Sequence, residues 1–123
     1  MTLTQLVCGS SVREREAEIA RVAALLPAGK SVAFILEGLA DANSQLQHLT
    51  DNPQYRFNRI APGCPCCVGN LVMRVTLNRL LRAAPDHLFV SIANSAHREQ
   101  MRSFLRNAPY DDYLIVQDDL IAI

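Results

Sequence analysis

The sequence predicts a three-layer α/β fold, in which a mostly parallel sheet carries helices on both faces. Short apolar runs alternate along the chain with amphipathic segments, and this order is typical of β-α-β units. The run Val32-Ala33-Phe34-Ile35-Leu36 is continuously apolar, as expected for a strand covered on both faces. Both observations favour a central parallel sheet.

Each expected strand is a short apolar run bounded by turn residues. The first ends at the turn Gly9-Ser10-Ser11, and the second begins at Ser31. The run at 120–123 is a candidate extension of the sheet. In chain order, the expected strands are 3–8, 31–36, 55–60, 87–93, 113–117 and 120–123.

Four amphipathic segments predict helices over 12–26, 41–50, 70–84 and 96–107. Ser11 and Glu14 fit a capping box at the start of the first helix. The segment 41–50 has the weakest pattern. The third helix is expected to end at Pro85, to bury Met73, Leu77, Leu80, Leu81 and Ala84, and to expose Arg74, Arg79 and Arg82.

Composition limits the classes of protein that this chain can belong to. Its 123 residues suit a single domain, 1–123, and twelve basic residues balance twelve acidic ones. We therefore expect no nucleic-acid partner. No apolar run reaches the roughly 18–20 residues of a membrane span, so we expect no membrane partner and a cytoplasmic location. Four cysteines are too few for a disulfide scaffold, and a reducing compartment keeps them as thiols or metal ligands.

A parallel sheet gathers the loops that follow its strands at one edge, where such folds bind ligands. Four loops are expected to meet there: 8–11, 62–69, 94–97 and 118–119. Any functional site is therefore expected at this edge.

One of these loops contains three cysteines in the run Gly63-Cys64-Pro65-Cys66-Cys67. Thiolates at this density suit zinc or copper(I), and Gly and Pro restrict the backbone that carries them. Zinc prefers four ligands, so a fourth position is left for water, a partner's side chain, His97 or Cys8. Cys8 is also expected to be a core residue at the end of its strand.

This cysteine run is followed by Asn70-Leu71-Val72 at a helix start and by Pro85-Asp86-His87-Leu88-Phe89-Val90 in a strand. The combination resembles the GTPase domain of the CobW/HypB/UreG family of metallochaperones. The resemblance implies a P-loop NTPase-like, Rossmann-like fold. It also implies metal binding at Cys64, Cys66 and Cys67, and the three thiols favour zinc or another thiophilic metal there.

The nucleotide-binding motifs of that family are missing. A P-loop reads G-x-x-x-x-G-K-S/T, whereas Cys8-Gly9-Ser10-Ser11-Val12-Arg13-Glu14 has no second glycine and no lysine. The triplet Gly29-Lys30-Ser31 precedes a strand instead of opening a helix. Ser91-Ile92-Ala93-Asn94 stands where the family has an acidic, glycine-containing strand end. The sequence therefore predicts a degenerate relative that binds metal and has lost GTP hydrolysis. GTP is not an expected cofactor, and a binding function is favoured over an enzymatic one.

Two other functions stay open on the residues alone. One is nucleotide binding, in which Arg13 stands in for the missing P-loop lysine and the phosphates contact the turn Gly9, Ser10 and Ser11. Thiol redox chemistry at the cysteine run is the other. A partner that receives the metal or completes its shell is expected but not identified. Exposed arginines on the helix after the cysteine run, or an uncovered sheet edge, are candidate surfaces for a homo-oligomer or for a partner protein.

Overall fold

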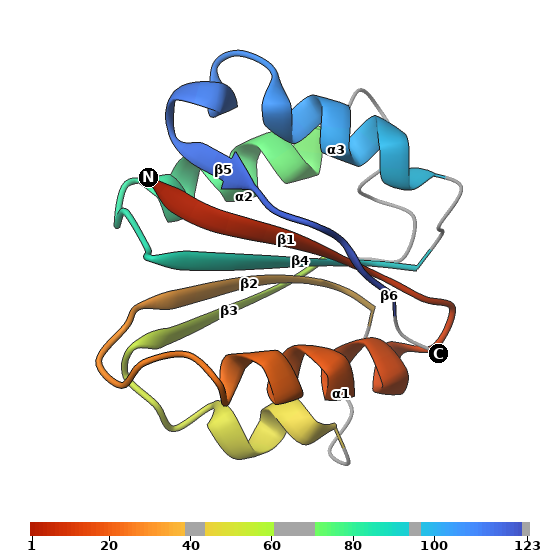
Figure 1. Cartoon of the computed structure of the whole chain (residues 1–123), viewed down its shortest axis with the longest axis vertical. Coiled ribbons are helices and arrows are strands. Elements are labelled where there is room, and N and C mark those ends of the chain that lie inside the picture. The colour runs from red at the N-terminus through yellow and green to blue at the C-terminus, as the bar shows by residue number, and fades with distance from the viewer. Residues whose placement is uncertain (39–43, 61–70, 94–96, 122–123) are drawn as a thin grey trace.

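A computed structural model of the chain describes residues 1–38, 44–60, 71–93 and 97–121 (Figure 1). Its centre is a six-stranded sheet in the order β3-β2-β4-β1-β5, with β6 also paired to β1. The pairs formed by these strands are all parallel. The strands are β1 Thr2–Cys8, β2 Val32–Glu37, β3 Tyr55–Ile60, β4 His87–Ile92, β5 Leu114–Val116 and β6 Leu120–Ile121. The predicted α/β class is confirmed.

Strand β1 lies inside the sheet although it begins the chain. It pairs with β4 in a register that sets Leu3 beside His87 and Cys8 beside Ile92. On its other side β5 pairs with 2–4 and β6 pairs with 7–8. The final strands thus follow one another along the same side of β1, which confirms the predicted extension of the sheet as far as Ile121.

Helices cover both faces of the sheet (Figure 1). The helices α2 Leu71–Leu81 and α3 Arg98–Arg106 lie on one face. On the other face lie α1 Val12–Ala23 and the short 3-10 helix η1 Gln45–Leu49. A second 3-10 turn, η5 Tyr110–Asp112, leads into β5.

Two apolar clusters fill the spaces between these layers. The cluster under α2 and α3 includes Met73 and Leu77 from α2 and Met101 and Leu105 from α3. The cluster on the α1 face is built around Phe34. The centroid of the Phe34 ring lies 4.6 Å from that of Phe57 and 5.7 Å from that of Phe89, and both pairs are stacked. The members of the second cluster are Val7, Ile19, Ala23, Val32, Phe34, Leu36, Leu46 and Phe89.

The helices are shorter than the sequence predicts, for local reasons. Helix α1 ends at Ala23, because Leu25 and Leu26 donate to carbonyls three residues back and tighten the last turn before Pro27. Helix α2 ends at Leu81. Three residues later Ala84 adopts a φ of +46°, and the helix-breaking Pro85 follows it.

The segment expected to be a helix over 41–50 also differs. Residues 45–49 form the 3-10 helix η1, and 39–43 lie outside the described residues. Ser44 caps this turn, since its hydroxyl accepts a bond from the backbone N–H of Leu46 at 3.2 Å. Within the described part of the chain, no helix is long and apolar enough to cross a bilayer.

Candidate functional site

The ends of β1, β2 and β4 lie side by side at the carboxyl edge of the sheet. Because the strands are parallel, Cys8 stands beside Ile92 and Leu36 beside Ser91 at this edge. Strand β3 also ends at this edge, at Ile60, and the cysteine run begins three residues later in the sequence. The edge predicted to carry the site is therefore the one on which the described strands converge.

A buried arginine joins these three strand ends. Arg15 of α1 is only 1% exposed. Its Nε donates to Ser91 Oγ at 2.7 Å, its Nη1 to the Gly9 carbonyl at 2.6 Å, and its Nη2 to the Glu37 carbonyl at 2.7 Å. We call Arg15 and these three partners the Arg15 network. Each bond reaches a different strand end, so one guanidinium ties together the centre of the edge.

Charge in the Arg15 network is partly balanced from within. Burial lowers the pKa of Arg15, and the carboxylates of Glu37 and Glu16 oppose that shift. The side chain of Glu37 is itself buried, and its Oε1 accepts a bond from the backbone N–H of Ala93 at 2.8 Å. The network thus combines a cation, a nearby carboxylate and backbone groups in a region with little water.

The turn between β1 and α1 is short and its polar groups are engaged. Only Gly9, Ser10 and Ser11 separate the strand from the helix. The Ser11 hydroxyl accepts a bond from the backbone N–H of Glu14 at 3.2 Å, which confirms the serine half of the predicted capping box. The Gly9 carbonyl is held by Arg15, whereas the side chains of Ser10 and Arg13 lie exposed.

Close packing between α1 and the end of β2 depends on a glycine. Gly38 has a φ of +120°, a conformation that residues with a side chain rarely adopt. A Cβ atom there would lie 2.8 Å from Val12 Cγ2. The glycine therefore allows the first turn of α1 to approach the strand end, which places Arg15 within reach of its partners.

A second buried ionic group sits further along the same helix. Glu16 is fully buried and pairs with Arg59 of β3, with 2.8 Å between Arg59 Nη1 and Glu16 Oε2. The hydroxyl of Ser44 also donates to Glu16 Oε1. These contacts fasten α1 to β3 and to the start of η1, so adjacent residues of α1 hold different parts of the carboxyl edge.

Cys8 is a core residue at this edge, as the sequence predicts. It is fully buried, and burial together with the Asp119 carboxylate raises the pKa of its thiol to about 11. Asp119 is in turn paired with Arg98, at 3.3 Å between Nε and Oδ2, and with Arg102. Burial and the raised pKa of the Cys8 thiol both disfavour the thiolate that a metal would bind.

The other predicted metal ligands divide between described and undescribed parts of the chain. Cys64, Cys66 and Cys67 lie outside the described residues. His97 precedes α3, and its Nδ1 lies 2.9 Å from Gln100 Oε1. Within the described ranges, no three His, Cys, Asp or Glu side chains are grouped so that they could hold a metal ion.

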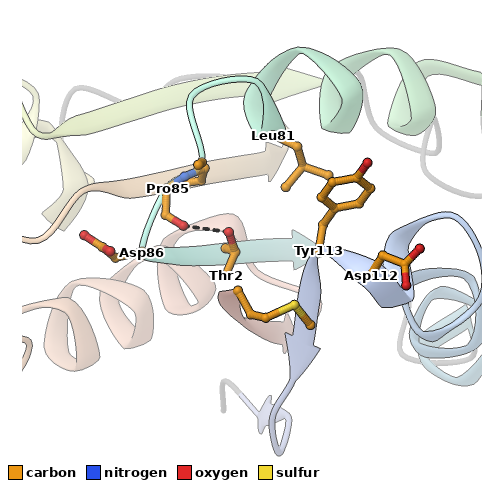
Figure 2. A pocket seen from close by; sticks show the side chains of 8 residues that line it. Thr2, Leu81, Pro85, Asp86, Asp112 and Tyr113 are labelled. Atoms are coloured by element: carbon orange, nitrogen blue, oxygen red, sulfur yellow. Dashed lines mark hydrogen bonds between the residues drawn. The ribbon is translucent and has the colours of Figure 1, made fainter.

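A pocket of about 200 Å³ lies at the opposite, amino-terminal edge of the sheet (Figure 2). In it the Thr2 hydroxyl donates to the Pro85 carbonyl at 2.6 Å, beside Leu81 and Tyr113. Both Asp86 and Asp112 point away from its centre (Figure 2). This small hollow is separate from the Arg15 network and brings no reactive groups together.

Sequence reasoning missed the buried charges of α1. One signal for them was present, because Arg15 lies four residues before Ile19 and eight before Ala23, on the buried stripe of the helix. Glu16 lies on the same stripe, three residues before Ile19 and seven before Ala23, but its partner Arg59 lies on a strand and could not be predicted from the sequence.

Comparison with known proteins adds one relative. The chain is 27% identical over 115 residues, 93% of its length, to the zinc chaperone YeiR of Escherichia coli (strain K12). The chain is thus distantly similar to a zinc chaperone. The matched region is 35% of YeiR, so the chain spans about a third of that protein's length. No family model and no solved structure matches the chain. The similarity supports the predicted relation to metallochaperones.

Proposed function

We propose that the chain is a zinc-binding protein of the metallochaperone type, in which Cys64, Cys66 and Cys67 hold the ion. The observation that carries the proposal is the similarity to a zinc chaperone over nearly the whole chain. The three thiols supply a donor set that zinc prefers, and the run begins shortly after the carboxyl end of β3. Thiolate ligands also need reducing conditions, which fits a cytoplasmic protein.

His97 is the better of the two candidates for a fourth ligand. When its Nδ1 donates to Gln100 Oε1, the unprotonated Nε2 is left to bind a metal, and such outer bonds commonly orient ligand histidines. Cys8 is buried and its thiol stays protonated, so we assign it to the core. A partner's side chain remains the alternative source of the fourth ligand.

We further propose that the chain does not hydrolyse GTP. A phosphate-binding loop wraps backbone N–H groups around the phosphates, but the turn here has three residues and Ser11 already caps the helix. The guanidinium of Arg15 donates a hydrogen bond to the carbonyl of Gly9 in this turn. The carboxylate of Glu14, in the first turn of α1, adds negative charge where a bound phosphate would need positive charge.

The first test measures the metal content of tag-free protein, purified under reducing conditions, by mass spectrometry. The parent is expected to carry near-stoichiometric zinc, and the triple variant Cys64→Ser, Cys66→Ser, Cys67→Ser none. The variant His97→Ala is expected to retain zinc with at least ten-fold weaker affinity. A parent that stays free of metal after zinc is added back would refute zinc binding.

The second test is calorimetric titration with GTP and ATP in the presence of magnesium. We expect no binding at millimolar nucleotide and no release of phosphate above a buffer blank. Saturable binding that is lost in Ser11→Ala or Arg13→Ala would instead support a nucleotide-binding protein with an unusual loop.

A further inference from the structure

The exposed side of α2 is apolar and basic, with no acidic side chain. Leu71 is 58% exposed, Val72 41% and Val75 56%, so large apolar groups face solvent over the first two turns. The exposed residues of this side are Leu71, Val72, Arg74, Val75, Asn78, Arg79 and Arg82, and we call them the α2 face. Contiguous apolar groups on a soluble protein commonly mark an interaction site.

The arginines of the α2 face are not neutralised. Arg74 lies over the ring of Phe104, with 5.5 Å from its Cζ to the ring centroid, and Arg79 donates to Asn58 Oδ1 at 3.1 Å. Neither these two nor Arg82 forms an ion pair with a carboxylate in the described part of the chain. Arginines elsewhere do so, as Arg59 does with Glu16. The α2 face therefore keeps its positive charge.

The positive charge of the α2 face distinguishes between the molecules that could bind there. A second copy of the chain that docked face to face would place arginine opposite arginine, because an isologous interface repeats the same patch. A bilayer would favour an apolar stripe along the full helix, whereas the exposed apolar groups of α2 end at Val75. A protein segment with apolar side chains flanked by Asp and Glu matches both the apolar turns and the arginines.

We propose that the α2 face is the docking surface for an acidic, amphipathic segment of a partner protein. The inference rests on the proposed function, since Leu71 comes four residues after Cys67 and the two can be at most roughly 14 Å apart. A partner docked on the first turn of α2 thus has its own side chains within reach of the cysteine run. This position suits a protein that receives the ion or completes its shell.

The test uses a pair of synthetic 15-residue peptides with leucines at the same helical spacing, one with glutamate and one with lysine on the polar side. Binding is followed by amide chemical shifts of the isotope-labelled full chain. We expect the glutamate peptide to shift amides of 71–82 and to bind at least ten-fold more tightly than the lysine peptide. Vesicles of phosphatidylcholine and phosphatidylserine (3:1) are expected not to bind.

Matched variants distinguish binding at the α2 face from non-specific binding elsewhere on the protein. Val75→Asp and Arg82→Glu are each expected to weaken binding of the glutamate peptide at least ten-fold. Leu25→Asp and Arg56→Glu make the same changes at exposed positions elsewhere and are expected to alter it less than two-fold. Equal binding of both peptides, shifts outside α2, binding to the vesicles alone, or no binding would each overturn the proposal.

Zinc content of the same samples keeps the two proposals apart. Val75→Asp and Arg82→Glu should carry as much zinc as the parent, because neither residue is a ligand. If the parent holds zinc but does not bind the glutamate peptide, the docking surface is rejected and the metal function is kept. A parent that holds no zinc but binds the glutamate peptide would reject the metal function and keep the surface as a docking site for another purpose.

Discussion

Replacing Arg15 by methionine removes the Arg15 network while it keeps most of the buried volume. Three acceptors then lose their donor: the carbonyls of Gly9 and Glu37 and the hydroxyl of Ser91. An unsatisfied buried polar group costs about 1–3 kcal/mol, and some of the three acceptors will find water. The Glu37 carboxylate also loses a nearby cation, which adds to this cost.

We therefore expect Arg15→Met to lower the free energy of unfolding by about 3–5 kcal/mol, a large part of the 5–15 kcal/mol typical of a domain. Urea denaturation at neutral pH measures this change. The control is Arg56→Met, which alters an exposed arginine of β3 and should change stability by less than about 0.5 kcal/mol. Arg15→Lys, with a single ammonium in place of the planar fork, should lie between the two.

Two results would refute the reasoning. If Arg15→Met costs no more than Arg56→Met, the network contributes nothing to the fold. If Arg15→Lys costs no less than Arg15→Met, the positive charge of residue 15 does not contribute to holding the three strand ends.

Three more changes have expected outcomes that denaturation can measure. Arg59→Met should cost about 2–4 kcal/mol because it strands a buried carboxylate of α1, whereas Arg56→Met on the same strand should be neutral; equal effects would contradict this. Gly38→Ala should cost about 2–4 kcal/mol from strain and overlap, against about 1–2 kcal/mol for Gly29→Ala, whose added Cβ meets no atom; the reverse order would be inconsistent with the packing. Between pH 9 and 11 the unfolded thiol of Cys8 ionises while the folded thiol keeps its proton, so the parent should lose about 2–3 kcal/mol relative to Cys8→Ala, and parallel pH profiles would disprove this.

Strands were the best predicted elements, because the inner strands are rich in apolar residues that pack against helices on both faces of the sheet. The run 32–36 is continuously apolar since β2 is buried along its whole length. Helix ends were predicted less well. Neither the φ of +46° at Ala84 nor the tight turns after Ala23 follow from hydrophobic periodicity.

The carboxyl edge of the sheet could be predicted from the sequence, but the contacts made there could not. The carboxyl edge follows from the alternation of strands and helices alone. The Arg15 network does not, because its members come from residues 9, 15, 37 and 91 and meet only when three strands have paired. A charged residue on an apolar stripe has no predictable partner until the fold supplies one.

The central place of β1 also fixes when folding can finish during synthesis. Leu3 must wait for His87, about eighty residues later, before its strand gains its neighbour β4. At the usual 5–20 residues per second, the ribosome needs roughly 4–16 s to make that stretch. Cys64, Cys66 and Cys67 are therefore synthesised before the sheet can close. For those seconds the three thiols are present in the growing chain while the carboxyl edge of the sheet is still incomplete.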